Sequence, residues 1–136
     1  MKKIVALLCF AFFALFAAPW AHAEDFKDLR AKMTVARETL VTMTTNKTKR
    51  GPEQQKLVKD TADAASALLG KLKAPAGKEA QFKELTDTWG AFKKTRETEL
   101  VPLILAGKED EALKLAGGIQ KERINKCMSL LGELGG

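Results

Sequence analysis

The chain has 136 residues and a formal net charge of +6, and its basic residues are spread along its whole length, usually with an acid nearby. This spacing excludes the dense basic patch that nucleic acid binding requires. The single histidine, His22, lies in the N-terminal segment, so the rest of the chain lacks the commonest catalytic and metal-binding side chain.

Residues 1–23 have the features of a Sec-type export signal. Lys2 and Lys3 give a basic start, an apolar stretch follows from residue 4 to residue 18, and Ala21-His22-Ala23 offers a small-x-small cleavage site. We therefore expect a periplasmic protein whose mature part, residues 24–136, carries a net charge of +4 and no membrane span. Two alternatives are an uncleaved anchor, for which the apolar stretch is barely long enough, and a lipid attached to Cys9.

The segment 24–49 predicts the first helix. Apolar residues recur in it at steps of three and four, which places two rows of side chains on one helical face. The rows are Phe26, Met33 and Leu40, and Leu29, Ala36 and Met43. After the break at Gly51-Pro52, a second helix is predicted over 52–73, and its apolar face comprises Leu57, Val58, Ala62, Ala65, Leu68, Leu69 and Leu72.

A third helix is expected over 78–106, after a loop at 74–77, and a fourth over 109–134, after a turn at 107–110. The apolar positions of the third are Phe82, Leu85, Trp89, Phe92, Leu100 and Leu103. Those of the fourth are Ala112, Leu113, Ala116, Ile119, Ile124, Cys127, Leu130, Leu131 and Leu134. Four amphipathic helices of similar length, joined by short loops, predict an all-α domain, a single antiparallel up-down-up-down four-helix bundle.

The residue types argue against a cofactor and against catalysis. Covalent haem needs Cys-x-x-Cys-His, and the segment that starts at Cys127 lacks both the second cysteine and the histidine. Di-iron bundles use Glu-x-x-His pairs, and zinc needs a cluster of His or Cys ligands; neither is present. No serine or cysteine lies in a motif with a base, so we expect a protein that is not an enzyme and binds no cofactor.

Cys127 is the one cysteine left after processing, so it is either buried or available to pair with another chain. Because it falls on the apolar face of the fourth predicted helix, we expect it to be buried.

Three charged residues interrupt the apolar rows, and they are the candidate ligand-binding residues. Arg96 occupies the row of Trp89, Glu99 continues the row of Phe92, and Arg123 lies on the row of the last helix. Antiparallel packing would bring the two arginines to one layer, where an anion could bridge them. The alternative is that their stems cover apolar surface while their charged ends reach water, or that Arg96 pairs with Glu99.

Two backbone features lie near these residues. Pro102 has no N–H to donate to Thr98, which predicts a kink or an early end of the third helix. Gly117-Gly118 weakens the fourth helix or allows another helix to approach it closely, and we expect the close approach.

The second half of the chain resembles the four-helix-bundle sensor domain of methyl-accepting chemotaxis proteins. The resemblance rests on Trp89-x-x-Phe92-x-x-x-Arg96, on the turn Ala106-Gly107-Lys108-Glu109-Asp110-Glu111-Ala112-Leu113, and on the spaced residues Ile119, Ile124, Leu130 and Leu134. It implies an extracytoplasmic, often dimeric module that binds small molecules such as amino acids or carboxylates near its helix interfaces. We expect a free-standing exported relative, with a small anionic ligand, a membrane receptor partner or a second copy as its partners.

The resulting hypothesis is a non-enzymatic ligand-binding or sensory-type module. Two alternatives stay open: a periplasmic interaction protein that acts like a chaperone, and a haem-less relative of bundle cytochromes.

Overall fold

The computed structural model describes the backbone of residues 5–136 and the side chains of residues 23–136. Over this range the chain is helical and forms no strand, which confirms the all-α prediction. The elements are α1 (Val5–Thr45), α2 (Pro52–Lys71), α3 (Glu79–Thr95), the π-helical segment η1 (Arg96–Leu100), α4 (Val101–Leu105), α5 (Glu109–Gly117) and α6 (Ile119–Leu134). The predicted signal, its cleavage site and Cys9 fall almost wholly outside the described side chains, so they stay predictions.

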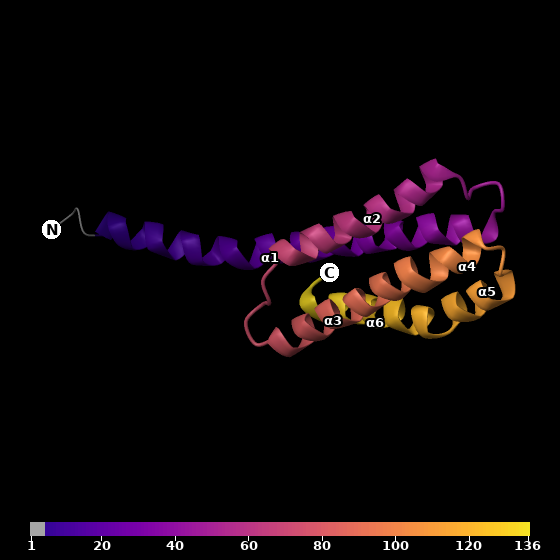
Figure 1. Cartoon of the computed structure of the whole chain (residues 1–136). Helices are drawn as coiled ribbons and strands as arrows, with labels where there is room; N and C mark the ends of the chain where they lie inside the picture. The colour runs from indigo at the N-terminus through magenta and orange to yellow at the C-terminus, as the bar shows by residue number, and fades with distance from the viewer. Residues whose placement is uncertain (1–4) are drawn as a thin grey trace.

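The helices are arranged as two hairpins that lie against each other (Figure 1). In the first hairpin, α2 folds back along the C-terminal half of α1. In the second, α6 packs along α3, while α4 and α5 form the opposite end. Contacts between the hairpins run mainly from α1 to α6, and fewer join α1 to α5. None of the described helices combines the length and the apolar character needed to cross a membrane.

The core confirms the apolar rows predicted for the first helix, because every member of both rows is buried. The same holds for most predicted positions of the other helices, including Trp89, Phe92 and Cys127. The predicted burial is wrong for three residues: Leu57, Leu113 and Ile119 are 47, 54 and 44% exposed. Leu113 lies one position after the buried Ala112, and Ile119 lies one position before the buried Gln120, so both fall beside the core-facing row of α5 and α6 rather than on it.

The third predicted helix passes Pro102 without a break, because one turn before the proline is wider than an α-turn. Residues 96–100 form η1, and the N–H of Val101 donates to the carbonyl of Arg96, five residues back. The expected distortion therefore takes the form of a π-turn, which directly precedes the residue that cannot donate. After α4, Gly107 adopts a φ of 73°, and Lys108 N–H donates to Leu103 O at 3.0 Å, which closes the helix end.

The glycine pair separates α5 from α6 rather than allowing another helix to approach. A Cβ on Gly118 would lie 2.8 Å from the carbonyl oxygen of Lys114 in the preceding turn, whereas a Cβ on Gly117 would meet no atom within 4 Å. The close-approach prediction is therefore wrong, since the nearest atoms to Gly118 belong to its own segment.

The two glycines should consequently respond in opposite ways to alanine. We expect Gly118→Ala to lower the free energy of unfolding by about 1–2 kcal/mol, because the Cβ forces the backbone to shift. Gly117→Ala should raise it by about 0.5–1 kcal/mol, because alanine loses less backbone entropy in a helix. Urea unfolding followed by circular dichroism measures both, and equal effects of the two substitutions would contradict the assigned break.

Candidate ligand site

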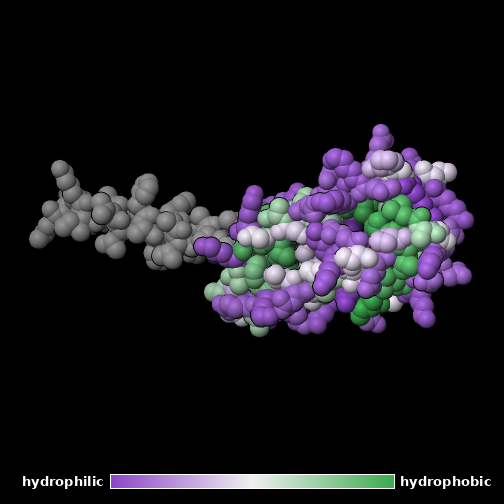
Figure 2. All heavy atoms as spheres, in the orientation of Figure 1, coloured by the Kyte–Doolittle hydropathy of each residue, from purple (hydrophilic) through white to green (hydrophobic). Residues whose placement is uncertain are grey.

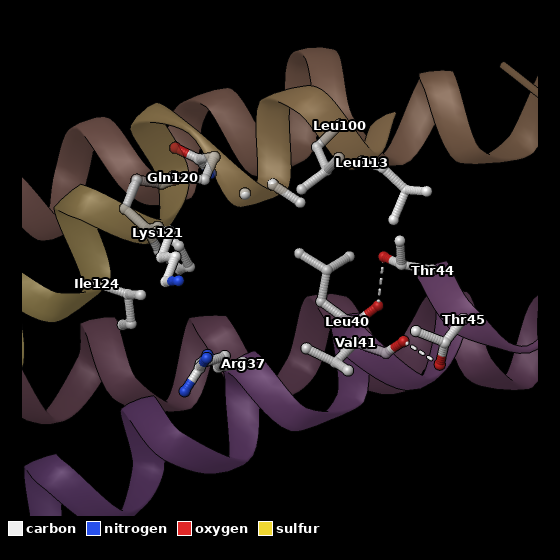
Figure 3. A pocket seen from close by; sticks show the side chains of 13 residues that line it. Arg37, Leu40, Val41, Thr44, Thr45, Leu100, Leu113, Gln120, Lys121 and Ile124 are labelled. Carbon is white, nitrogen blue, oxygen red and sulfur yellow. Dashed lines mark hydrogen bonds between the residues drawn. The ribbon is translucent and has the colours of Figure 1, made fainter. Parts of the chain in front are cut away.

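A cavity of about 320 Å³ lies between the two hairpins, where α1 faces the junction of α5 and α6 (Figure 3). It is lined by Arg37, Leu40, Val41, Thr44, Thr45, Phe92, Leu100, Leu113, Ala116, Gly117, Gln120, Lys121 and Ile124. The break at Gly118 lies directly beside this wall. The small residues Ala116 and Gly117 leave the space that a larger side chain would fill.

Most of the cavity wall is apolar. Leu40, Phe92, Leu100 and Ile124 are buried and supply its inner part, while Val41 and Leu113 lie about half exposed. The threonine hydroxyls add little polarity, because each donates to its own helix: Thr44 to Leu40 O and Thr45 to Val41 O, both at 2.8 Å (Figure 3). A ligand would therefore meet mainly hydrocarbon.

Two cationic side chains, Arg37 from α1 and Lys121 from α6, lie at one side of the cavity (Figure 3). Both are exposed, and neither forms an ion pair with any side chain in residues 23–136. Sequence reasoning did not single them out. The sequence held only a weak indication of their position. Arg37 lies three positions before the buried Leu40, and Lys121 lies three positions before the buried Ile124.

Gln120 is the buried polar residue of the cavity wall, at 2% exposure. Its Nε2 donates to Phe92 O at 2.9 Å, and its Oε1 accepts from Arg123 Nη1 at 3.0 Å. The same Arg123 atom donates to Thr95 Oγ1 at 2.9 Å. Arg123, one of the predicted site residues, is thus connected to the cavity through a single hydrogen bond and does not line it.

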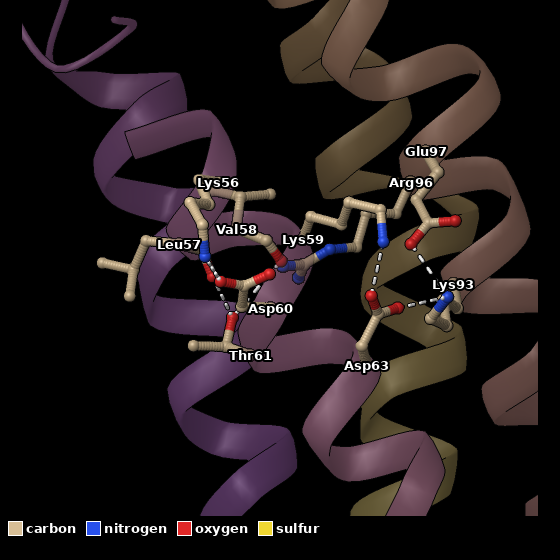
Figure 4. A network of polar contacts seen from close by, with 10 residues as sticks. All are labelled: Lys56, Leu57, Val58, Lys59, Asp60, Thr61, Asp63, Lys93, Arg96 and Glu97. Atoms are coloured by element: carbon tan, nitrogen blue, oxygen red, sulfur yellow. Dashed lines mark hydrogen bonds and ion pairs between the residues drawn. The ribbon is translucent and has the colours of Figure 1, made fainter. Parts of the chain in front are cut away.

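Arg96 lies on the other side of α3 and η1, facing α1 and α2 (Figure 4). It is fully buried, so the alternative that its charged end reaches water is wrong. Its Nη1 donates to Ala36 O at 2.6 Å and its Nη2 to Val58 O at 2.5 Å, while its Nε has no partner. Burial lowers the pKa of Arg96 to about 10, against the opposing effect of Glu97 and Asp63, so it stays charged at neutral pH.

Threonine hydroxyls lie beside the two carbonyls that accept from Arg96. Thr39 Oγ1 donates to Ala36 O at 2.9 Å. Thr61 Oγ1 donates to Leu57 O at 2.8 Å and lies 3.3 Å from Val58 O, and the two hydroxyl oxygens are 3.1 Å apart. This polar layer therefore joins α1, α2 and η1. The structure gives Arg96 and Arg123 separate partners, and the guanidinium groups do not share one set of acceptors.

Glu99, the third predicted site residue, is exposed and forms no ion pair with Arg96. It borders a shallow surface depression beside Pro102 and Lys108. The acids near Arg96 are instead Asp63 and Glu97, which both pair with Lys93 at 2.9 Å (Figure 4). Hydrogen bonds from Lys59 and Lys93 lower the pKa of Asp63, so its charge favours the buried guanidinium nearby.

Within the described side chains, no group of three or more His, Cys, Asp and Glu residues is placed to hold a metal ion. Comparison with known proteins found no matching family model, no matching curated protein and no matching solved structure. The function is therefore inferred from the residues of the site.

Proposed function

We propose that the chain is an exported, non-enzymatic ligand-binding or sensory-type module, built as an up-down-up-down four-helix bundle. The observation that carries this proposal is the cavity between α1 and the α5–α6 junction. Its volume of about 320 Å³ falls in the range of small-molecule sites. It combines an apolar wall with a few polar groups, which is the composition of a binding pocket.

The non-enzymatic part of the proposal rests on the chemistry of the cavity wall. No carboxylate, thiol or imidazole is among the residues that line it. Cys127 is fully buried, and burial raises the pKa of its thiol to about 12, so it is not a nucleophile at neutral pH. The site is suited to binding rather than to bond making.

The sensory part of the proposal rests on the resemblance to chemoreceptor sensor domains. Trp89, Phe92 and Arg96, on which the resemblance depends, are all buried. A ligand held between α1 and α6 would alter the contact between the hairpins. In a periplasmic setting, this change could be passed to a second copy or to a membrane receptor.

A cavity-filling substitution tests this proposal. We expect a thermal-shift screen of amino acids, organic acids and other small organic anions to give at least one compound that raises the unfolding midpoint. Gly117→Phe, which places a ring at the cavity wall, should abolish that shift. Gly90→Phe on α3 is the matched control, because its Cβ also meets no atom within 4 Å and it does not line the cavity.

The control variant should keep the shift of the original protein. A screen in which no compound raises the midpoint, or a shift that survives Gly117→Phe, would reject the cavity as the ligand site.

The second candidate function is that of an interaction protein with chaperone-like behaviour. Six large apolar side chains are 44–54% exposed, namely Val35, Val41, Leu57, Leu105, Leu113 and Ile119. Figure 2 shows apolar surface toward the end of the molecule where α4 and α5 lie. Suppression of the aggregation of an unfolded client, combined with a flat ligand screen, would favour this function over ligand binding.

A further inference from the structure

We propose that the ligand of this cavity is an aliphatic monocarboxylate of about eight carbons, with its tail in the cavity and its carboxylate between Arg37 and Lys121. This inference rests on the proposed function and specifies the ligand class of the same site. It is carried by the size of the cavity, by the character of its wall and by the charge at its edge.

The tail length follows from the volume. Water occupies about 30 Å³ per molecule in the liquid, so a cavity of about 320 Å³ has room for about ten groups of similar size. Octanoate has eight carbons and two oxygens, so the cavity has room for the whole molecule, its carboxylate included. The wall around the tail would be formed by Leu40, Phe92, Leu100 and Ile124, which are buried and offer no charge to solvate.

The head group follows from the two cations. Arg37 and Lys121 come from different helices and lie on the same side of the cavity (Figure 3). Two other basic residues between the helices have acidic partners, since Arg50 pairs with Glu109 at 3.3 Å and Lys93 with Asp63 at 2.9 Å. Arg30, Arg96 and Arg123 have none, but their guanidinium groups donate to carbonyl, hydroxyl or amide oxygens of the protein. No carboxylate lines the cavity, so two unneutralised positive charges stand beside an apolar space. A carboxylate supplies the missing charge, and its two oxygens match the planar fork of arginine.

Neutral and cationic ligands of the same length complement this site less well. An alcohol would leave both cations without an anion, and an alkylammonium ion would add a third positive charge at the same opening. Electrostatics therefore orders the three head groups, with the carboxylate first, the alcohol second and the amine last.

Titration calorimetry of the purified protein with octanoate, octanol and octylammonium tests the inference. We expect octanoate to bind roughly tenfold more tightly than octanol, and octylammonium to bind most weakly. Arg37→Gln and Lys121→Gln should each weaken octanoate binding by roughly tenfold while leaving octanol binding unchanged. Lys73→Gln is the matched control, because it removes an exposed cation in the loop after α2, away from the cavity.

Each outcome separates the inference from the proposed function. Equal binding of octanoate and octanol, or unchanged octanoate binding in both glutamine variants, would overturn the carboxylate and keep the cavity as a binding site. Failure of all three probes, with a different compound active in the wider screen, would overturn the ligand class alone. A wholly flat screen would overturn the proposed function as well. Circular dichroism melts of the variants should show unchanged folding, because both cations are exposed.

Discussion

Arg96→Ala is expected to lower the free energy of unfolding by about 3 kcal/mol, whereas Arg96→Met should leave the protein about as stable as the original or slightly more stable. Alanine leaves a void where a fully buried side chain lay. Methionine fills most of that space and removes a desolvated charge that has no ion-pair partner and one unsatisfied N–H. In both variants Ala36 O keeps the hydrogen bond from Thr39 Oγ1, and both carbonyls keep the backbone N–H partners of their own helices.

Urea unfolding of the three proteins, followed by circular dichroism, measures this difference. A Met variant as unstable as the Ala variant would show that the hydrogen bonds of the guanidinium, rather than its volume, stabilise the fold. We expect the volume of the side chain, rather than its charge, to determine stability at this position, so that an arginine in this layer is not needed for folding. Retention of ligand binding by Arg96→Met would then separate Arg96 from the cavity, on whose wall it does not lie.

The thiol of Cys127 is expected to react with a disulfide reagent at least 1000-fold more slowly in the native protein than in urea. The side chain is fully buried, so reaction requires unfolding, which costs at least about 5 kcal/mol in a typical domain.

Burial also raises the pKa of the Cys127 thiol to about 12. Because the unfolded thiol loses its proton near pH 9 while the folded one keeps it, the contribution of Cys127 to stability should fall as the pH rises between about 9 and 12.

The matched control for this pH effect is Cys127→Ala, which should lose that part of the decline in stability. Rapid labelling of the native protein, or a disulfide-linked dimer on a non-reducing gel, would contradict the burial of Cys127. The sequence predicted this burial from the position of Cys127 on an apolar row, and the structure confirms it.

The helices and most of the core could be predicted because a period of three and four residues determines which side chains share a face. Phe26, Met33 and Leu40 are buried for that reason. The same rule failed for Leu113 and Ile119, because each lies one position from a buried residue, and helical spacing alone did not place the edge of the buried face. The π-turn that begins at Arg96 could not be predicted either, although Pro102 indicated a distortion of the helix near residue 102.

The candidate site was harder to predict, because a long side chain can reach to either side of its helix. Arg96 and Arg123 interrupt apolar rows at similar heights, yet one contacts α1 and α2 and the other contacts Thr95 and Gln120. Arg37 and Lys121 do not interrupt an apolar row. The sequence gives no reason to single them out, because exposed cations next to an apolar row are common on amphipathic helices. Their role depends on the cavity between the hairpins, which only the packing of the helices creates.

An NMR titration of the isotopically labelled protein with octanoate tests whether this cavity is a ligand site. We expect the amide shift changes to concentrate on residues 37–45 of α1 and 113–124 of α5 and α6, including the side-chain amide of Gln120. Saturable changes confined to the outer surface of α2, or no change at ligand concentrations that shift the unfolding midpoint, would contradict it.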